Sequence, residues 1–178
     1  MRPELEDVGL PTIDSTITAD EAWRLKELAA GALVVEVGSW RGFSTVCMAQ
    51  VAAFVHAVDH HLGDEQAGYD ESLSYLMEAL DVYDVRSKVV VHVGSSEDVL
   101  PVLPADYFDL AFHDSFHEAE AVRRDVALLR RVVRVGGFIA FHDYGLFDVK
   151  EVVDENATEG WLEWIDLTET LAVTRRTA

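Results

Sequence analysis

The sequence predicts a single α/β domain with a doubly wound, mostly parallel sheet. Short β-branched runs alternate along the chain with segments whose apolar residues recur at helical spacing. Glycine-rich and polar turns follow the carboxyl ends of these runs, which is where such folds bind their ligands. The chain has 178 residues, of which 49% are hydrophobic, so it can build one core and is not a disordered protein.

The first predicted helix spans residues 19–30. Thr18 and Glu21 stand at the spacing of a capping box, in which each side chain accepts a hydrogen bond from the backbone of the other. Gly31 is expected to end this helix. The apolar residues that recur at helical spacing within it are Ala22, Leu25, Leu28 and Ala29.

Seven apolar runs are predicted as strands, five of them parallel and the last two a closing antiparallel pair. The runs are 33–37, 54–58, 89–93, 108–113, 138–142, 161–165 and 171–174. The expected helices between them are 43–52, 71–83, 96–103, a segment around 122–133, and 147–156. Gly136 and Gly137 are expected to end the helix that precedes the fifth strand. Alternating strands and helices imply a parallel sheet covered on both faces.

The charge balance restricts the partners and the compartment. Asp and Glu number 33 against 14 Lys and Arg, which gives a net charge of -19. A surface this acidic repels phosphate backbones, so nucleic acid is not an expected partner. Cys47 is the only cysteine, so an intramolecular disulfide is excluded. The acidic N-terminus lacks the apolar core of a secretory signal, and no apolar run reaches the roughly 18 residues of a membrane span. We therefore expect a cytoplasmic protein with no membrane partner.

The turn after the first strand is a candidate binding element. Its glycines, Gly38 and Gly42, allow a tight turn and a close approach of ligand to backbone. Trp40 stands where a dinucleotide fingerprint needs glycine, and no lysine follows Gly42, which excludes a phosphate loop of the Walker type. Glu36, two residues before Gly38, suits a ligand that carries an ammonium group. A plain strand-to-helix turn is the alternative.

Polar residues also follow the second and third strands. Asp59 ends the second strand, where an acid can accept both hydroxyls of a ribose, and a solvated acid or a helix cap is the alternative. Ser95 or Ser96, after the third strand, could bond an adenine edge or cap the short helix behind them. His60 and His61 are adjacent and point in different directions, which argues against a paired metal site.

Strands four and five end in the same tripeptide, Phe-His-Asp, whose acids are Asp114 and Asp143. Consecutive strands usually lie side by side, so we expect these two acids to converge, with His117 or His142 nearby. Carboxylates with an imidazole suit a hard cation such as magnesium, and the candidate ligands are Asp114, Asp143 and His142. Capping of the following helix and turn is the alternative.

Three segments taken together resemble class I S-adenosyl-L-methionine-dependent methyltransferases. They are residues 35–45, 108–117 and 136–144, and the resemblance extends in order over residues 18–176. The nearest branch carries D-G-x-H after strand four and H-D-Y after strand five. It is similar to O-methyltransferases of sugars and natural products, some of them magnesium-dependent. The resemblance implies a Rossmann-like, seven-stranded sheet with a C-terminal hairpin, in one domain over residues 1–178 with residues 1–17 as an extension.

The resemblance also implies where S-adenosylmethionine binds. The turn after the first strand would flank its methionine end, Asp59 would contact the ribose, and Ser95 or Ser96 would lie by the adenine. The full expected set of cofactor-binding residues is Glu36, Gly38, Ser39, Trp40, Gly42, Ser44, Asp59, Ser95, Ser96 and Asp114.

The chain departs from the resembled branch at two strand ends. After Asp114 it has Ser115 and Phe116 where the family usually has Gly and Asp, which makes the surroundings more apolar and weakens the metal assignment. After the third strand it has Ser95 and Ser96 where many relatives carry Asp followed by Ser. That second departure leaves the adenine contact undefined.

The expected reaction is transfer of a methyl group from a sulfonium to a small-molecule hydroxyl, whose proton needs a general base or a metal. His117 is the first candidate base, His142 the second, and Asp114 completes the catalytic set. We expect His117 to open the helix after strand four, where the helix dipole disfavours a positive imidazolium. The alternatives are a cofactor-binding relative without catalysis and a nicotinamide-dependent oxidoreductase, against which Trp40 argues. A homodimer partner could supply a wall of the acceptor pocket.

Overall fold

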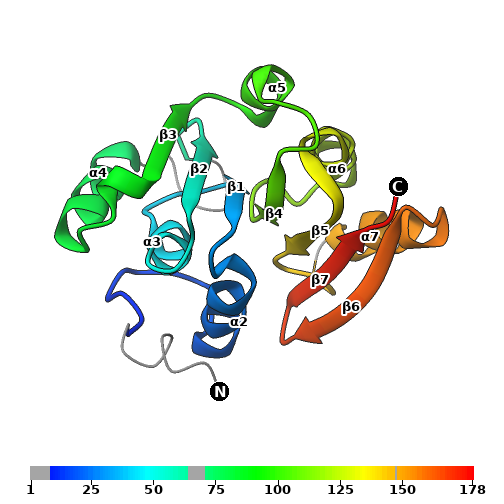
Figure 1. Cartoon of the computed structure of the whole chain (residues 1–178), viewed down its shortest axis with the longest axis horizontal. Coiled ribbons are helices and arrows are strands. Elements are labelled where there is room, and N and C mark those ends of the chain that lie inside the picture. The colour runs from blue at the N-terminus through cyan, green and yellow to red at the C-terminus, as the bar shows by residue number, and fades with distance from the viewer. Residues whose placement is uncertain (1–8, 64–70, 147) are drawn as a thin grey trace.

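The computed structural model describes residues 9–63, 71–146 and 148–178 and contains a seven-stranded sheet (Figure 1). The strand order is β3-β2-β1-β4-β5-β7-β6. Neighbours among the first five strands are parallel, and β7 is antiparallel to both β5 and β6. The strands are β1 Leu33–Val37, β2 Phe54–Asp59, β3 Val89–Val93, β4 Phe108–His113, β5 Val133–Phe141, β6 Leu162–Thr168 and β7 Leu171–Arg176. The predicted mostly parallel sheet with a C-terminal hairpin is confirmed.

Helices cover both faces of the sheet and enclose one apolar core on each face. The helices are α2 Ala19–Ala29, α3 Phe43–Ala49, α4 Leu73–Val82, α5 Ser96–Val99, α6 Ala119–Val132 and α7 Val149–Thr158. Short 3-10 helices span Arg86–Lys88 and Leu100–Val102. Side chains of α2, α3 and α4 pack in one core, and those of α6 and α7 pack in the other (Figure 1). Among the described residues, no helix combines the length and the apolar character that crossing a membrane requires.

The expected end of the helix before β5 is wrong. Gly136 and Gly137 lie inside β5, because α6 stops at Val132 and Val133 already has extended backbone. Gly136 has a φ of 80°, and the pairing of β4 with β5 shifts register at this point, as in a β-bulge. A Cβ on Gly137 would lie 2.7 Å from Val133 Cγ1, so the bulge requires a glycine there. A Gly-Gly pair in the sequence is compatible with either a helix end or a strand bulge, so it could not distinguish the two.

Other helix boundaries differ by less. The helix expected over 43–52 ends at Ala49, and the one expected over 96–103 divides into α5 and a 3-10 turn that contains Pro101. The last helix was expected to begin at Phe147, a position outside the described residues, and α7 begins at Val149. These differences leave every predicted element in its predicted order.

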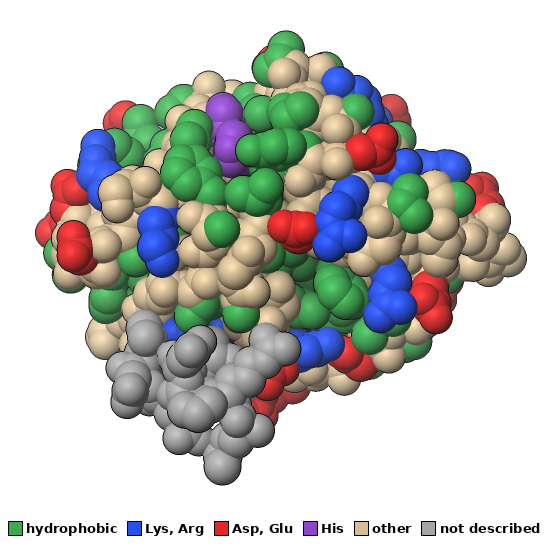
Figure 2. Space-filling view, in the orientation of Figure 1, with side chains coloured by type: hydrophobic (Ala, Val, Ile, Leu, Met, Phe, Trp, Pro, Cys, Tyr) green, Lys and Arg blue, Asp and Glu red, His purple; other side chains and the backbone are tan. Residues whose placement is uncertain are grey.

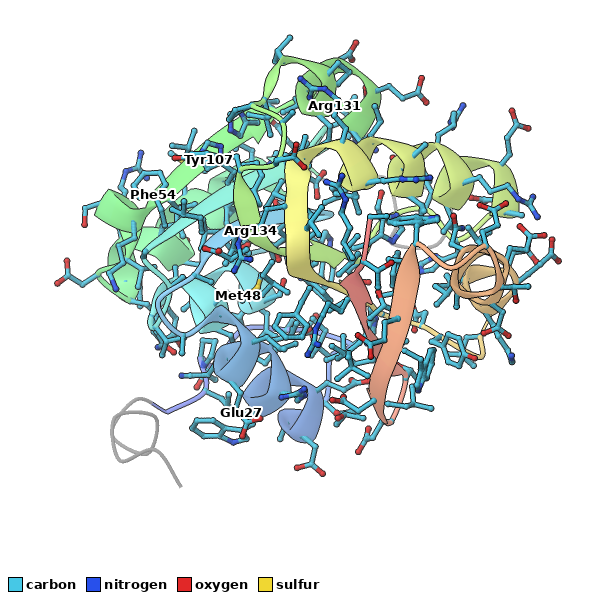
Figure 3. All side chains as sticks on the ribbon, turned by 45° about the vertical axis from the view of Figure 1, so that its right-hand side comes forward. Glu27, Met48, Phe54, Tyr107, Arg131 and Arg134 are labelled. Carbon is cyan, nitrogen blue, oxygen red and sulfur yellow. The ribbon has the colours of Figure 1, made fainter. Side chains whose placement is uncertain are left out.

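The edge strand β3 is only partly covered, since none of its residues is buried. Hydrophobic side chains gather there around a histidine pair, in which His56 Nδ1 lies 3.0 Å from His92 Nε2 (Figure 2). Phe54 packs edge-on against His56, and Figure 3 shows Phe54 and Tyr107 on the same side of the molecule. Burial lowers the pKa of both histidines, so this surface is apolar and uncharged at neutral pH.

Candidate functional site

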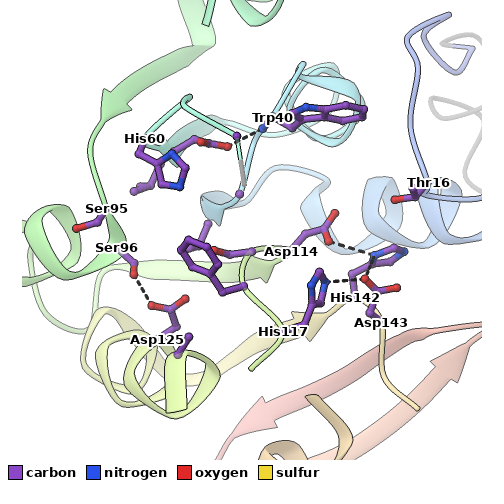
Figure 4. A pocket seen from close by; sticks show the side chains of 18 of the residues that line it. Thr16, Trp40, His60, Ser95, Ser96, Asp114, His117, Asp125, His142 and Asp143 are labelled. Atoms are coloured by element: carbon purple, nitrogen blue, oxygen red, sulfur yellow. Dashed lines mark hydrogen bonds and ion pairs between the residues drawn. The ribbon is translucent and has the colours of Figure 1, made fainter. Parts of the chain in front are cut away.

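A cavity of about 650 Å³ opens at the carboxyl ends of the parallel strands (Figure 4). Its wall includes residues that follow each of these strands: Gly38, His60, Gly94, Asp114 and His142. Small-molecule sites typically occupy roughly 300–1,000 Å³. Both its size and its place at the sheet edge make this cavity the candidate active site.

The structure brings most of the expected cofactor-binding residues to this cavity. Those that line it are Gly38, Trp40, Asp59, Ser95, Ser96 and Asp114. Those that lie behind its wall are Glu36, Ser39, Gly42 and Ser44. The second group shapes the turn: Gly42 N, for example, donates a 2.8 Å hydrogen bond to Ser39 O.

Glu36 supports the turn from below and does not face the cavity, contrary to expectation. Its side chain is fully buried, and the hydroxyls of Ser44 and Thr45 each donate a hydrogen bond to one of its carboxylate oxygens. Burial raises the pKa of Glu36 to about 8, although these two hydrogen bonds lower it. The residue therefore fixes the start of α3 and is not among the residues that line the cavity.

The two glycines of the turn are required by packing within the protein. Gly38 has a φ of 92°, and a Cβ there would lie 1.8 Å from the carbonyl oxygen of Asp114. Gly42 has a φ of 93°, and its Cβ would lie 2.7 Å from Leu76 Cδ1. The absence of a side chain at Gly38 thus lets the end of β4 press against the turn, which brings Asp114 into the cavity wall.

Asp59 holds the turn from the neighbouring strand. Its Oδ2 accepts hydrogen bonds from the backbone nitrogens of Ser39 and Trp40, at 3.0 and 2.8 Å. Its Oδ1 accepts a 2.7 Å bond from the backbone nitrogen of His61. Trp40 has a φ of 40°, an unfavourable conformation for a residue with a side chain, and these bonds stabilise it. Asp59 both braces the turn and lines the cavity, which the sequence alone did not show.

The side chain of Trp40 contributes a polar group that no described residue satisfies. The indole nitrogen Nε1 is buried and has no hydrogen-bond partner among the described residues. The ring itself stacks with the Arg41 guanidinium at 4.8 Å, and the same guanidinium lies 4.8 Å from the ring of Tyr75. A buried N–H without an acceptor is costly, so the cavity wall at Trp40 suits a ligand that brings an acceptor.

His142 lies at the centre of a cluster of three carboxylates. Its Nδ1 is 3.1 Å from Asp114 Oδ1 and 3.5 Å from Asp143 Oδ2, and its Nε2 is 3.4 Å from Glu21 Oε2. Burial lowers the pKa of His142, but the hydrogen bonds and charges of Asp114 and Asp143 outweigh burial and raise the pKa to about 11. The ring is an imidazolium at neutral pH. As an imidazolium His142 would be neither a general base nor a metal ligand, so the structure favours His117 over His142 for the role of base.

His117 lines the cavity and pairs with Asp143. Its Nε2 is 2.8 Å from Asp143 Oδ2. The contact with Asp143 raises the pKa of His117 against the effect of burial, and His117 and His142 together lower the pKa of Asp143. His117 does not open α6, which begins at Ala119. The helix dipole was expected to keep its imidazole neutral, whereas Asp143 raises its pKa and so favours the charged form.

The described residues whose ligand atoms lie close enough to share a cation include His117 where the sequence suggested His142. Asp114, His117 and Asp143 each offer one ligand atom, and these atoms lie within 4.8 Å of one another. Magnesium demands several oxygen ligands in near-octahedral geometry. Here Asp114 Oδ1 is 3.1 Å from His142 Nδ1 and Asp143 Oδ2 is 2.8 Å from His117 Nε2, so a cation would have to displace contacts that these acids already make. We derive no catalytic step through a metal.

We expect neither magnesium nor a chelator to change the melting temperature of the protein. A cation bound to the native state would raise it by mass action, but the imidazole protons already neutralise the acids of this cluster. Thermal unfolding in millimolar MgCl2 and in EDTA measures the effect. A magnesium-dependent rise that Asp114→Asn abolishes would restore the metal site.

The sheet order, the C-terminal hairpin and the cavity across the carboxyl edge together define a class I S-adenosylmethionine-dependent methyltransferase. A family model described as a methyltransferase domain matches residues 35–144, and the chain belongs to that family. No curated protein matches the chain in sequence.

Solved structures of methyltransferases superpose on nearly the whole chain. The O-methyltransferase NovP shares 19% identity at a TM-score of 0.77, over 92% of this chain and 82% of that chain. TomG, an O-methyltransferase from Streptomyces achromogenes solved with S-adenosylmethionine, shares 16% sequence identity at a TM-score of 0.72. The match covers 98% of this chain and 86% of that chain. An O-methyltransferase from Bacillus cereus solved with S-adenosylhomocysteine shares 16% sequence identity at a TM-score of 0.72. The match covers 98% of this chain and 90% of that chain. At these identities the likeness establishes the fold.

Proposed function

We propose that the protein transfers the methyl group of S-adenosylmethionine to a hydroxyl of a small molecule, such as a sugar or a natural product. The observation that carries this proposal is the His117–Asp143 pair, an imidazole held by a carboxylate in the wall of the cavity. A hydroxyl is a weak nucleophile while it keeps its proton, and a positioned imidazole is the common group that removes it.

The cavity residues fit S-adenosylmethionine. Trp40 lines the cavity and its buried indole N–H lacks an acceptor among the described residues, which supports a hydrogen bond from it to the methionine carboxylate. Asp59 Oδ1 accepts one backbone hydrogen bond and so retains a lone pair for a ribose hydroxyl. When bound, the cofactor supplies an electrophilic methyl group on a sulfonium. The protein's part is to hold the acceptor oxygen in line with that methyl group, since orientation can supply much of the acceleration.

In the mechanism that we propose, His117 accepts the acceptor's proton at Nδ1 while Nε2–H donates to Asp143. Asp143 fixes the orientation of the ring and stabilises the imidazolium that forms, as a carboxylate does in hydrolase triads. His142 keeps Asp114 and Asp143 in place as a permanent cation, and Glu21 anchors His142 from α2. His117 is then the catalytic residue, and the other groups position it.

The charge of the cavity favours neutral or cationic acceptors. The acids that line it are Glu21, Asp59, Glu97, Asp114, Asp125, Asp143 and Glu169. Among the described lining residues, the one arginine or lysine is Arg124, which is 3.0 Å from Glu97. An anionic acceptor would meet net repulsion, so we expect phosphorylated acceptors to be poor substrates.

Methyl transfer to a panel of acceptors tests the proposal. Labelled S-adenosylmethionine is incubated with sugars, phenols, amines and thiols, and the product is analysed for the atom that carries the label. We expect label on oxygen. Tight cofactor binding without transfer to any acceptor would favour a non-catalytic relative, and binding of a nicotinamide cofactor in place of S-adenosylmethionine would favour an oxidoreductase.

The pH dependence of turnover is expected to show a limb on the acid side, above pH 6.5. A base must be neutral to act, and Asp143 raises the pKa of His117 above its ordinary value of 6.5, so activity falls as pH decreases through that raised pKa. Asp143→Asn removes the carboxylate, so the limb should move to lower pH. Glu151→Gln, which removes an exposed charge from α7, is the matched control. An unchanged limb in Asp143→Asn would separate Asp143 from the base.

A further inference from the structure

The two serines after β3 have their hydroxyl protons committed inside the protein. Ser95 caps α5, because its Oγ accepts from Asp98 N at 3.2 Å and donates to Asp98 Oδ2 at 2.7 Å. Ser96 Oγ donates a hydrogen bond to Oδ1 of Asp125, a residue of α6. The carboxylate that accepts from Ser96, Asp125, is therefore the candidate group for a ligand contact.

Asp125 is a buried carboxylate in the wall of the cavity. It is 3% exposed, and its Oδ2 lies 3.0 Å from His113 Nε2. No ion pair among the described residues joins it to a lysine or arginine. A carboxylate has about four lone-pair positions, and the Ser96 hydroxyl and the His113 ring occupy one on each oxygen. Asp125 therefore presents unused acceptor capacity to the cavity, at a place where an unmatched buried acceptor is costly.

The position of Asp125 identifies the part of the ligand that it meets. The Asp114, His117 and Asp143 side chains lie on one side of the cavity, and Ser96 and Asp125 lie on the opposite side (Figure 4). In the sheet, β2 with Asp59 lies between β3 and the strands that carry the transfer residues. If the methyl group lies by His117 and the ribose by Asp59, the base at the far end of the cofactor lies by Asp125. This step rests on the proposed function.

We propose that Asp125 reads the adenine base by accepting a hydrogen bond from its 6-amino group, with Ser96 and His113 as the positioning residues. Each partner contacts one oxygen of the carboxylate, and together they fix its plane. A 6-amino group donates to the carboxylate, whereas a 6-oxo group would place an acceptor against it. The carboxylate on α6 thus discriminates adenine from hypoxanthine.

Binding of two ligands that differ at this one position tests the inference. They are S-adenosylhomocysteine and S-inosylhomocysteine, in which the 6-amino group is replaced by an oxo group. We expect the wild-type protein to bind S-adenosylhomocysteine at least about tenfold more tightly, as for a hydrogen bond to a charged group. In Asp125→Asn, the amide can donate to the oxo group, so the ratio of affinities should fall to about threefold or invert. Calorimetry measures both ligands without any need for turnover.

A neighbouring acid provides the matched control. Glu97 lines the same cavity and pairs with Arg124, so Glu97→Gln removes a carboxylate without touching Asp125. We expect it to leave the ratio unchanged. Ser96→Ala keeps the Asp125 charge and releases one of its supports, and we expect it to reduce the ratio in a folded protein even if Asp125→Asn does not fold.

The outcomes separate this inference from the proposed function. Equal weakening of both ligands in Asp125→Asn, with the ratio intact, would make Asp125 structural and overturn the inference. A change in the ratio of the two affinities in Glu97→Gln alone would assign recognition of the adenine to Glu97. Failure of the wild-type protein to bind either ligand would overturn the cofactor site itself, and hence both proposals.

Discussion

Replacing His117 with alanine is expected to lower turnover by about 10²–10⁴-fold, the range that a positioned general base contributes. The affinity for S-adenosylhomocysteine should change little, because His117 lies beside Asp143 (Figure 4), on the side of the cavity where we propose that the acceptor binds. Steady-state kinetics with saturating cofactor, combined with calorimetry on the same preparation, separates the two effects.

His92→Ala is the control for this experiment, since it removes an imidazole that lies outside the cavity, against His56 on the sheet. It should retain normal turnover. Near-normal activity of His117→Ala at every pH would remove His117 from the mechanism, and a parallel loss of cofactor affinity would make it a binding residue.

Replacing Asp59 with alanine is expected to weaken cofactor binding by about 1.5–3 kcal/mol, the range for a hydrogen bond to a charged group. The structure places the expected loss at the upper end, because Asp59 also accepts backbone hydrogen bonds from Ser39 and Trp40. Without them, the strained backbone of Trp40 loses its support and the turn loosens. Calorimetry with S-adenosylhomocysteine measures the loss.

Asp81→Ala is a suitable comparison, since it removes an exposed carboxylate that pairs with Arg86 away from the cavity. It should bind the cofactor normally. A loss below about threefold in a folded Asp59→Ala protein would show that the turn keeps its shape unaided and that the ribose makes no bond to this acid.

The strand ends were the most predictable part of this molecule. The bounds of β1, β3 and β4 agree with the apolar runs in the sequence, because buried parallel strands are short, β-branched and bounded by turn residues. Topology then follows, since parallel strands that alternate with helices deliver their carboxyl ends to one edge. For this reason Gly38, Asp59 and Asp114 could be placed in one cavity without coordinates.

The charge state of His142 could not be predicted. It depends on Asp114 and Asp143, whose distances from the ring are set by the register of β4 against β5. Asp125 was missed for a related reason. It stands beside Val126 on a helix rich in arginine, where an acid reads as solvent-exposed, and only the fold brings it against His113.

The orientation of Glu36 follows from the alternation of side chains along β1. Side chains alternate along β1, and Val34 packs with α2 and α3 while Val35 and Val37 pack with α6 and α7. Glu36 must then share the side of Val34, towards α3. The hydroxyls of Ser44 and Thr45, at the start of that helix, were the signal that its partners lie within the protein.

Glu21 has a consequence for the order in which the site is assembled during synthesis. It accepts hydrogen bonds from the backbone and hydroxyl of both Thr18 and Thr170, and it faces His142. The ribosome makes this carboxylate long before Thr170, which follows it by 149 residues. Until the β6–β7 hairpin emerges, Glu21 lacks the two hydrogen bonds from Thr170 that hold it opposite His142. The cluster around His142 is therefore complete only when α2 and this hairpin have met.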